Sequence, residues 1–556
     1  MQVINNKITN IPDISNMTLR QKIGQLFIVR DDVLYEMLAD SELKGYLEKN
    51  PIGGIWATSL LKRPAEFMNF DSAEQGGTLR DLKTYINLIN SYLTIPVIVG
   101  GDSEKGGYMG SAEISGPDAV VAADEVSLAY RYGACVANEL KCGGLNWRWS
   151  PISDLCHHDS AISVNRVCSD EPEKVIEFSK ALIKGSQDSG VAATVKHFPG
   201  QDINEIRDSH FMSSINNASF EDWMATQGRV YKEAIDSGVY SVMIGHHAFP
   251  AIDDTKIGNK RRPATFSKKI ITDLLKKEWG FDGVVVTDDI GMRSAFSMYG
   301  RENMGLMYTE LIKAGNDMIL GSPIGRNFED YIGEVEKAVK NGELSEERVD
   351  DACRRVFELK KKVGLFDQIY ETEFDEARLK KATEQTHIMN KEIAEKSLTL
   401  ISNSNGLLPL NKSSVKKVAI VSITHFEPFV QKLEELKNAF ADIGVDAEII
   451  EIGKCNLKYT SENFDIILYA NFVSAHKPFG HCSFFGTVAQ QFFKVLSYGS
   501  EKSVVVSFGS PFLRREYYEE AETYINAYWY NREVMEALVK ALFGDIPFVG
   551  KSPFDI

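Results

Sequence analysis

Short apolar runs alternate with amphipathic stretches along the first two thirds of the chain. The runs are apolar on both faces, which is typical of parallel strands that are covered by helices. One stretch between them, Ser267–Glu278, places its isoleucines and leucines on a single helical face. The predicted strands are Leu26–Val29, Gly54–Ala57, Pro96–Gly100, Gly144–Trp149, Ala192–His197, Val239–Gly245, Gly283–Thr287 and Asp317–Gly321.

Repeated strand–helix units of this kind predict an α/β fold with a TIM-type (β/α)8 barrel and long loops. The strand pattern alone leaves a doubly wound open sheet as the alternative. After a polar segment that contains Gly406 and Pro409, the alternation restarts and predicts a second core. We therefore expect a barrel domain at 1–398, with an N-terminal extension and a connecting helix, a linker at 399–415, and a smaller α/β sandwich domain at 416–556.

Composition and charge limit which kinds of partner and which cellular location we expect for this protein. The net charge is −16, which disfavours a nucleic-acid groove or an anionic membrane surface because both need clustered positive charge. No apolar run approaches the roughly 20 residues of a membrane-spanning helix, and the N-terminus lacks a signal-peptide pattern. The cysteines are odd in number and scattered, which is typical of free thiols. We expect a soluble cytoplasmic protein without nucleic-acid or membrane partners, and the sequence assigns no oligomeric state.

Polar side chains follow several predicted strands at the point where each strand ends. They are Asp102, the pair Lys196–His197, the pair His246–His247 and the pair Asp288–Asp289. In a barrel, the carboxyl ends of the strands meet on one face and carry the catalytic groups. A single aspartate at a strand end can instead cap the next helix. Several such ends on one face favour an active site that includes His246.

The stretch from Lys196 to His210, KHFPGQDINEIRDSH, contains the strongest local pattern. It ends in Asp208-Ser209-His210, a spacing in which a carboxylate can orient an imidazole and stabilise its protonated form. An Asp-x-His in a loop is also common in solvated turns. The position just after a strand-end Lys-His favours the catalytic interpretation.

The combination of motifs resembles family 3 glycoside hydrolases, in particular their β-N-acetylhexosaminidase branch. KHFPG and DSH carry the likeness together with VVVTDDIGM downstream and GGDSEKGG upstream, and it extends from MTLRQKIGQLF to FGDIPFVGKSPF. The resemblance implies a barrel followed by an α/β sandwich. It also implies a retaining exo-β-N-acetylglucosaminidase that cleaves terminal β-linked N-acetylhexosamine from a small carbohydrate through a covalent glycosyl-enzyme. A β-glucosidase or glycoside phosphorylase of the same family and a catalytically silent sugar-binding relative stay open as alternatives.

The resemblance assigns roles residue by residue. It makes Asp288 the nucleophile, and the two aspartates of this pair point to opposite faces of an extended strand end, so only one can face the barrel mouth. It makes His210, together with Asp208, the acid/base in place of a second carboxylate. The positions that match sugar-binding residues of the family are Asp102, Arg166, Lys196 and His197.

Two segments depart from the family pattern. Gln201-Asp202 stands where the family usually has His-Gly, and the loop from Gly200 to Asp208 is one residue longer than usual. Around Arg166 the sequence reads RVCS, so only the arginine matches.

Two further observations are negative. The run from Cys156 to Asp159, Cys-His-His-Asp, has adjacent ligands that rarely converge on one ion, so we predict no metal and no cofactor. In the second domain, the stretch Tyr469–Val488 has no Asp or Glu, whereas β-glucosidases of the family supply a catalytic Glu from this region.

Overall fold

The computed structural model describes residues 12–39, 42–58, 78–105, 111–158, 165–321, 328–366, 373–473 and 483–556. The chain forms two compact units, each with its own buried apolar core. The first comprises 1–112, 130–154 and 179–384, and the second comprises 113–129, 155–178 and 385–556. Among the described residues, no helix combines the length and the apolar character that crossing a membrane requires.

The described part of the first unit contains a closed ring of eight parallel strands. Two arcs of strands, in the orders β12-β1-β2-β3-β4 and β11-β7-β5, are joined by parallel bridges between Trp147 and Ala192 and between Val286 and Met318. These bridges close the ring, which confirms the predicted α/β barrel and excludes the open doubly wound sheet. The strands are β1 (Phe27–Arg30), β2 (Gly54–Trp56), β3 (Ile98–Gly101), β4 (Trp147–Arg148), β5 (Thr194–Phe198), β7 (Ser241–Ile244), β11 (Val284–Thr287) and β12 (Ile319–Leu320).

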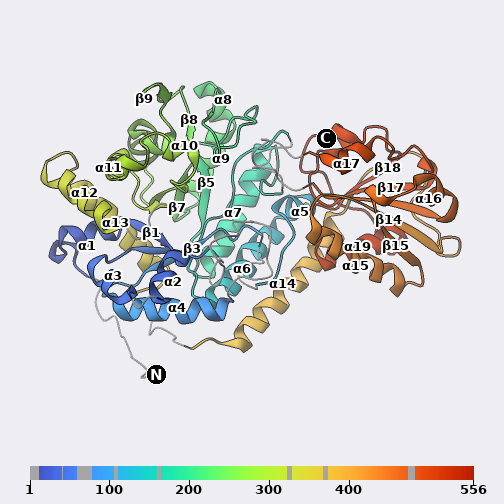
Figure 1. Cartoon of the computed structure of the whole chain (residues 1–556), viewed down its shortest axis with the longest axis horizontal. Helices are drawn as coiled ribbons and strands as arrows, with labels where there is room; N and C mark the ends of the chain where they lie inside the picture. Colours follow the sequence, from blue (N-terminus) through green and yellow to red (C-terminus); the bar gives the residue numbers. More distant parts are fainter. Residues whose placement is uncertain are drawn as a thin grey trace. The chain divides into compact units, whose positions relative to one another are not determined.

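Helices lie outside this ring and alternate with its strands along the chain (Figure 1). The stretch predicted as an amphipathic helix forms the π-helix η5 (Lys269–Glu278), whose isoleucines and leucines are buried as expected. The other main helices are α2 (Asp31–Ala39), α3 (Leu43–Lys49), α4 (Leu79–Tyr92), α6 (Val126–Cys142), α7 (Pro172–Asp188), α8 (Phe220–Ala225), α9 (Gln227–Asp236), α10 (Arg293–Phe296), α11 (Met304–Ala314), α12 (Phe328–Lys340) and α13 (Glu346–Lys362).

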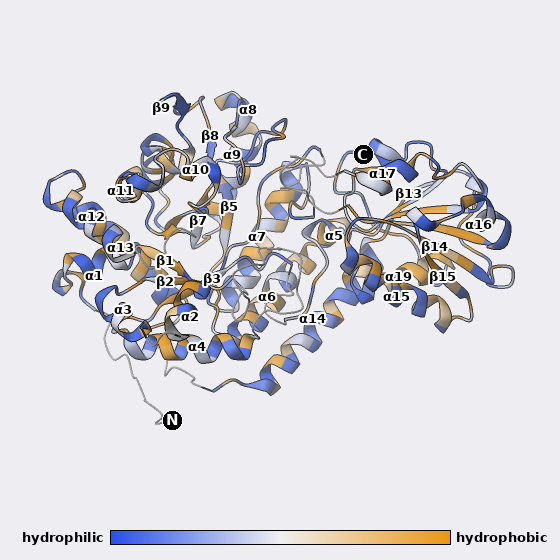
Figure 2. Cartoon of the chain, viewed as in Figure 1, coloured by the Kyte–Doolittle hydropathy of each residue, from blue (hydrophilic) through white to orange (hydrophobic). Residues whose placement is uncertain are grey.

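The strands are apolar on both faces because each face packs against a different core. In β7, Val242 and Ile244 belong to the cluster that includes Ile270 of η5, whereas Met243 belongs to a cluster that contains Trp149. This division follows the alternation of side chains along a strand. Figure 2 shows the strands coloured as hydrophobic and the helices with both colours. A Cβ on Gly100 would lie 2.7 Å from the Trp149 ring, so glycine allows that indole to fill the space between the strands.

The second unit contains a mainly parallel sheet with the strand order β13-β18-β17-β16-β14-β15. Only β13 is antiparallel to its neighbour among these strands. One face packs against α15 (Glu427–Asp442) and α19 (Arg532–Leu542), and the other packs against α16 (Leu457–Asn463), α17 (Gly486–Phe492) and α18 (Leu513–Tyr517). The strands are β13 (Thr399–Asn403), β14 (Lys417–Ile423), β15 (Asp446–Glu451), β16 (Ile466–Asn471), β17 (Ser503–Ser507) and β18 (Thr523–Asn526).

This sheet and its helices correspond to the predicted second α/β domain. The sheet contains one strand that the sequence pattern did not indicate. The edge strand β13 begins directly after residue 398, inside the range 399–415 that was expected to be a linker. Its alternation is weak because most of its residues are only partly buried. The domain boundaries at 398 and 415 stay a prediction.

Candidate active site

The candidate residues of the first unit lie at the carboxyl ends of parallel barrel strands. Asp102 directly follows β3, Lys196 and His197 belong to the end of β5, and Asp288 directly follows β11. His246 comes just after β7. Because neighbouring strands of a parallel barrel end on the same face, these side chains gather at one mouth of the ring. This is the arrangement that the strand-end pattern predicted.

Asp288 lies among three histidines and one lysine, His197, His246, His210 and Lys196. Its amide donates a hydrogen bond of 3.0 Å to the carbonyl of Ile244 in β7, and its Oδ1 accepts the amide of Asp289 at 2.8 Å. Burial raises the pKa of this carboxyl, but its electrostatic interactions with His197, His246, His210 and Lys196 outweigh burial and hold the pKa well below its usual value. Asp288 is therefore an anion, which is the form a carboxylate nucleophile requires.

Asp208 and His210 form a hydrogen-bonded pair on the loop after β5. Oδ1 of Asp208 lies 2.6 Å from Nδ1 of His210 and also accepts the His210 amide at 2.8 Å. The Asp208 side chain is fully buried, whereas that of His210 is 31% exposed. The carboxylate thus holds Nδ1–H, and Nε2 on the other edge of the ring can exchange a proton with a substrate.

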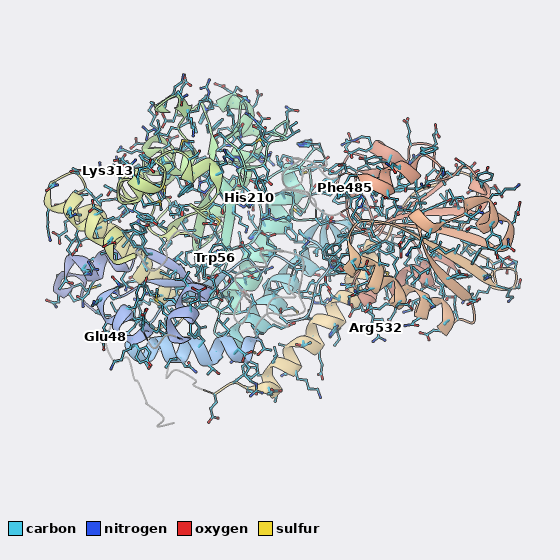
Figure 3. All side chains as sticks on the ribbon, viewed as in Figure 1. Glu48, Trp56, His210, Lys313, Phe485 and Arg532 are labelled. Carbon is cyan, nitrogen blue, oxygen red and sulfur yellow. The ribbon has the colours of Figure 1, made fainter. Side chains whose placement is uncertain are left out.

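The main chain ties this loop to the segment after Asp288. The amide of Arg293, the first residue of α10, donates to the carbonyl of His210 at 3.0 Å, and the amide of Ser294 donates to the carbonyl of Ser209 at 3.3 Å. His210, labelled in Figure 3, is therefore attached to the loop that carries Asp288. A carboxylate and an imidazole on adjoining loops can act together on one substrate bond, the first as nucleophile and the second as proton donor to the leaving group.

His197 has a carboxylate partner of its own. Its Nδ1 lies 2.9 Å from Oδ2 of Asp154, and Oδ1 of Asp154 accepts the hydroxyl of Tyr231 on α9 at 2.6 Å. Burial raises the pKa of Asp154, but the hydrogen bonds from His197 and Tyr231 outweigh burial, so the pKa of this carboxyl lies below its usual value. This contact fixes the His197 ring through Nδ1 and leaves Nε2 for other contacts.

Asp154 and Tyr231 were missed in the sequence. Asp154 ends the segment SPISD that begins just after β4, so the strand-end rule that selected Asp102 would also have selected it. Tyr231 lies within a helix and carries no local sign of its role.

Lys196 is buried and held by two carboxylates. Its Nζ donates to Oδ1 of Asp102 at 2.6 Å and to Oε1 of Glu104 at 2.8 Å. The Asp102 side chain is 46% exposed, so its carboxylate also faces outward, whereas the Lys196 side chain is almost fully covered. Glu104 was not predicted, although it belongs to the same GGDSEKGG motif.

His246 and His247 are both buried but have different partners. Nε2 of His246 donates to the carbonyl of Asp289 at 3.0 Å, and no hydrogen-bond partner of its Nδ1 is found among the described residues. Burial lowers the pKa of His246 despite the charge of Asp288. His247 lies with Nδ1 2.6 Å from Oγ of Ser214, and burial lowers its pKa to about 4. His246 thus offers a buried acceptor atom near Asp288.

Arg166 belongs to the other compact unit, so the structure does not group it with the residues above. The preceding Asn165 is buried in that unit and donates from Nδ2 to Oδ2 of Asp118 at 3.0 Å. The same nitrogen donates to the carbonyls of Gly509 at 3.0 Å and Tyr528 at 3.1 Å. The chain before Arg166 is therefore fixed within the second unit, and the sugar-binding role of Arg166 stays a prediction.

The run that resembles a metal site has other contacts. Sγ of Cys156 donates to the carbonyl of His158 at 2.9 Å, and Asp159 lies outside the described residues. Across the described ranges, no group of three or more His, Cys, Asp or Glu side chains is arranged to hold a metal ion.

Comparisons with known proteins point to one family. Residues 18–359 match the glycosyl hydrolase family 3 N terminal domain. The chain is 26% identical to a β-N-acetylglucosaminidase/β-glucosidase of Cellulomonas fimi, over 96% of this chain and 93% of that protein. It is 34% identical to a β-hexosaminidase of Stenotrophomonas maltophilia (strain K279a), over 32% of this chain and 50% of that protein.

Solved structures share the fold of the whole chain. A β-glucoside phosphorylase, BglX, superposes with a TM-score of 0.80 at 23% identity, covering 97% of this chain and 94% of that one. A family 3 β-N-acetylglucosaminidase from Paenibacillus sp. str. FPU-7 superposes with a TM-score of 0.78 at 24% identity, covering 97% and 99%. With the match to the family's N-terminal domain across most of the chain, the protein belongs to glycosyl hydrolase family 3, a family of glycosidases.

Proposed function

We propose that this glycosidase is a retaining exo-β-N-acetylglucosaminidase that removes terminal β-linked N-acetylhexosamine. The observation that carries the proposal is the Asp208–His210 pair, which is attached by the main chain to the segment after Asp288. The relatives from Cellulomonas fimi and Stenotrophomonas maltophilia support the choice of sugar, because their names include N-acetylglucosaminidase and hexosaminidase.

In the first step, a carboxylate oxygen of Asp288 attacks the anomeric carbon of the sugar. The bond from that carbon to the leaving oxygen breaks, and Nε2 of His210 gives its proton to this oxygen. The sugar is then held as an ester of Asp288. The imidazolium of His210 is stabilised before the transfer by the buried Asp208 carboxylate, 2.6 Å from Nδ1.

In the second step, the neutral His210 acts as a base. It takes a proton from a water molecule through Nε2, and the water oxygen attacks the anomeric carbon from the side that the leaving group vacated. The ester bond to Asp288 breaks, and its carboxylate is restored. Two inversions at the anomeric carbon give a product with the β configuration of the substrate.

The remaining candidate residues bind the sugar in this proposal. Asp102 and Lys196 form a hydrogen-bonded pair that can accept from and donate to neighbouring hydroxyls. His197 contributes Nε2, because Asp154 holds its other nitrogen. His246 completes this set of barrel residues. Hydrogen bonds to the sugar hydroxyls can strengthen in the oxocarbenium-like transition state and so lower the barrier.

The second domain has no part in proton transfer in this proposal. Its stretch Tyr469–Val488 contains no carboxylate side chain that could replace His210, although residues 474–482 of that stretch lie outside the described residues. A histidine in the barrel is then the acid/base, and the C-terminal α/β domain has a structural role in this proposal.

Two alternatives have specific support. A β-glucosidase is favoured by the double name of the Cellulomonas fimi relative. A phosphorylase is favoured by charge, because a neutral imidazole does not repel an incoming phosphate as a carboxylate base would. A silent sugar-binding protein is disfavoured, since binding alone requires none of Asp288, Asp208 and His210.

One pair of assays tests the proposal. Nitrophenyl β-N-acetylglucosaminide and nitrophenyl β-glucoside are compared at equal concentrations, and we expect the first to have the higher kcat/KM. A higher value for the glucoside would assign the β-glucosidase instead. Product analysis in phosphate buffer is run beside it, and sugar 1-phosphate as the main product would assign a phosphorylase.

A further inference from the structure

In the loop that carries His210, the polar residues are buried and the large apolar residues are exposed, which is the reverse of the usual distribution. Its buried residues are polar or charged: Gln201, Glu205, Asp208 and Ser209. Its large apolar side chains face solvent, with exposed fractions of 39% for Ile203, 58% for Ile206, 41% for Phe211 and 40% for Met212. Buried polar groups and clustered exposed apolar groups are the informative exceptions to the usual distribution.

The buried polar residues explain how the loop is ordered without an apolar core. Nε2 of Gln201 donates to the carbonyl of Glu205, and Nε2 of Gln227 donates to the carbonyl of Gln201, each at 2.7 Å. The Glu205 carboxylate accepts the Arg207 side chain and the amide of Ile215 at 2.9 Å. Hydrogen bonds therefore hold the loop, and its apolar side chains are not needed for that purpose.

In the sequence, the exposed apolar residues lie on both sides of the proposed proton donor. Phe211 and Met212 directly follow His210, and both of their amides donate to the carbonyl of Asp208, at 3.1 and 3.0 Å. Ile206 and Ile203 precede Asp208 on the same loop. Leaving such side chains in water costs free energy in proportion to their apolar area, which a ligand would recover by covering them.

We propose that Ile203, Ile206, Phe211 and Met212 form the apolar wall of a leaving-group subsite, so that the substrate carries an alkyl or aryl aglycone. The inference rests on the proposed function, because His210 protonates the leaving oxygen only if that oxygen lies at its Nε2. The group attached to the oxygen then extends over the residues beside His210. An apolar aglycone would bury these side chains against apolar atoms, whereas the hydroxyls of a sugar in this position would find no hydrogen-bond partner on them.

Competitive inhibition by alkyl 1-thioglycosides tests the subsite without relying on their cleavage. The sugar is kept constant, the chain is lengthened from methyl to hexyl, and Ki is measured against nitrophenyl glycoside hydrolysis. Each methylene that becomes fully buried lowers Ki by up to about fourfold. We expect a total fall in Ki of about tenfold or more over the series.

Paired variants assign the effect to the loop. The double variant Ile206→Ser/Phe211→Ser should flatten the dependence of Ki on chain length. Phe220→Ser is the matched control, because Phe220 is 38% exposed but lies at the start of α8, outside the loop. The control should keep the wild-type dependence.

The outcomes separate this inference from the function on which it rests. If the nitrophenyl glycosides are cleaved but Ki is the same for methyl and hexyl, the apolar subsite is wrong and the glycosidase assignment stands. If neither nitrophenyl glycoside is cleaved, the proposed function fails and the inference fails with it. Sedimentation of the wild type and the double variant is measured as well. A dimer that the variant abolishes, together with a flat Ki, would assign the apolar side chains to an interface between copies.

Discussion

The amide of Arg293 donates a hydrogen bond of 3.0 Å to the carbonyl of His210, and this joins the loop after β5 to the start of α10. Since α10 follows Asp288 closely in the chain, the distance between the proposed proton donor and nucleophile is set by the main chain. Side-chain substitutions at either residue should therefore remove a chemical group while leaving the partner in place.

His210→Ala should slow glycosides with poor leaving groups much more than activated ones. Proton donation contributes about 10² to 10⁴-fold to such reactions, and an alkyl leaving group needs it whereas a nitrophenyl group does not. We expect a loss of this size in kcat/KM for an alkyl glycoside and a small loss for the dinitrophenyl glycoside. Because the second step also needs the base, the dinitrophenyl substrate should give a burst of phenol.

Asp208→Asn is the companion variant for this prediction. It keeps the shape of the buried side chain but removes the charge that stabilises protonated His210. The same ranking of leaving groups should result. Equal losses for both classes of substrate would remove the pair from proton transfer.

Asp154→Asn should impair the site through His197. The carboxylate holds Nδ1 of His197 at 2.9 Å, and a small displacement of a binding group costs up to about 10²-fold in rate. Tyr231→Phe, which removes the hydroxyl bound to Asp154, should show a smaller loss in the same direction. The measurement is kcat/KM as a function of pH, together with the melting temperature.

Tyr308→Phe provides the control for the loss of a buried hydroxyl. Tyr308 is fully buried in the same barrel unit, and no hydrogen-bond partner of its hydroxyl is found among the described residues. It should leave kcat/KM unchanged. An unchanged kcat/KM in Asp154→Asn, together with a lowered melting temperature, would show that Asp154 only stabilises the fold.

The stability of the barrel should fall as the pH drops from about 6.5 to about 4, in part through His247. Its pKa is lowered from 6.5 to about 4 by burial, so over this interval the unfolded chain binds a proton that the folded chain does not. Binding of that proton favours the unfolded state, and it lowers the free energy of unfolding by about 3 kcal/mol at most. Below about pH 4 both states are protonated and the loss ends.

His247→Gln should therefore reduce the pH dependence of the urea midpoint between these limits. His387→Gln is the control for replacing a histidine by glutamine at the surface, since the His387 side chain is 56% exposed. A midpoint that depends on pH as strongly in His247→Gln as in the wild type would rule out this source of acid sensitivity.

Chelation should leave the rate unchanged. The proposed reaction uses only a carboxylate and a histidine, and a glycosidic bond can be cleaved by such a pair without a metal. Dialysis against EDTA is compared with a dialysed control. A rate lost on chelation and restored by zinc or magnesium would direct attention back to Cys156, His157 and His158.

The barrel strands could be predicted because each is an apolar run between helical stretches, as in β7 and β11. The strand pattern alone could not decide between a closed ring and an open sheet, since closure depends on the bridges at Trp147–Ala192 and Val286–Met318, which join residues distant in sequence. The strand β13 escaped notice because its partner, β18, is far along the chain and most of its residues are only partly buried.

In the candidate site, the sequence predicts hydrogen-bonded pairs of nearby residues but not pairs of residues far apart in the chain. Asp208 and His210 lie two residues apart, so their spacing predicts the contact. The carboxylate of Asp154 meets His197 across 43 positions of sequence, and only the neighbouring barrel strands bring them together. The inverted polarity of the His210 loop was also hidden, because burial of Gln201 and Glu205 depends on partners elsewhere in the fold.

The most direct test of the proposed mechanism is to trap the glycosyl-enzyme with a mechanism-based fluoro-sugar and locate the label by peptide mass spectrometry. Asp288 should carry the sugar, and Asp288→Ala should be unlabelled and lose about 10⁴-fold or more in kcat while keeping the wild-type fold. The Asp289→Asn variant, one residue away, is the control and should still be labelled. A sugar attached to any other carboxylate, with Asp288→Ala still active, would contradict the account.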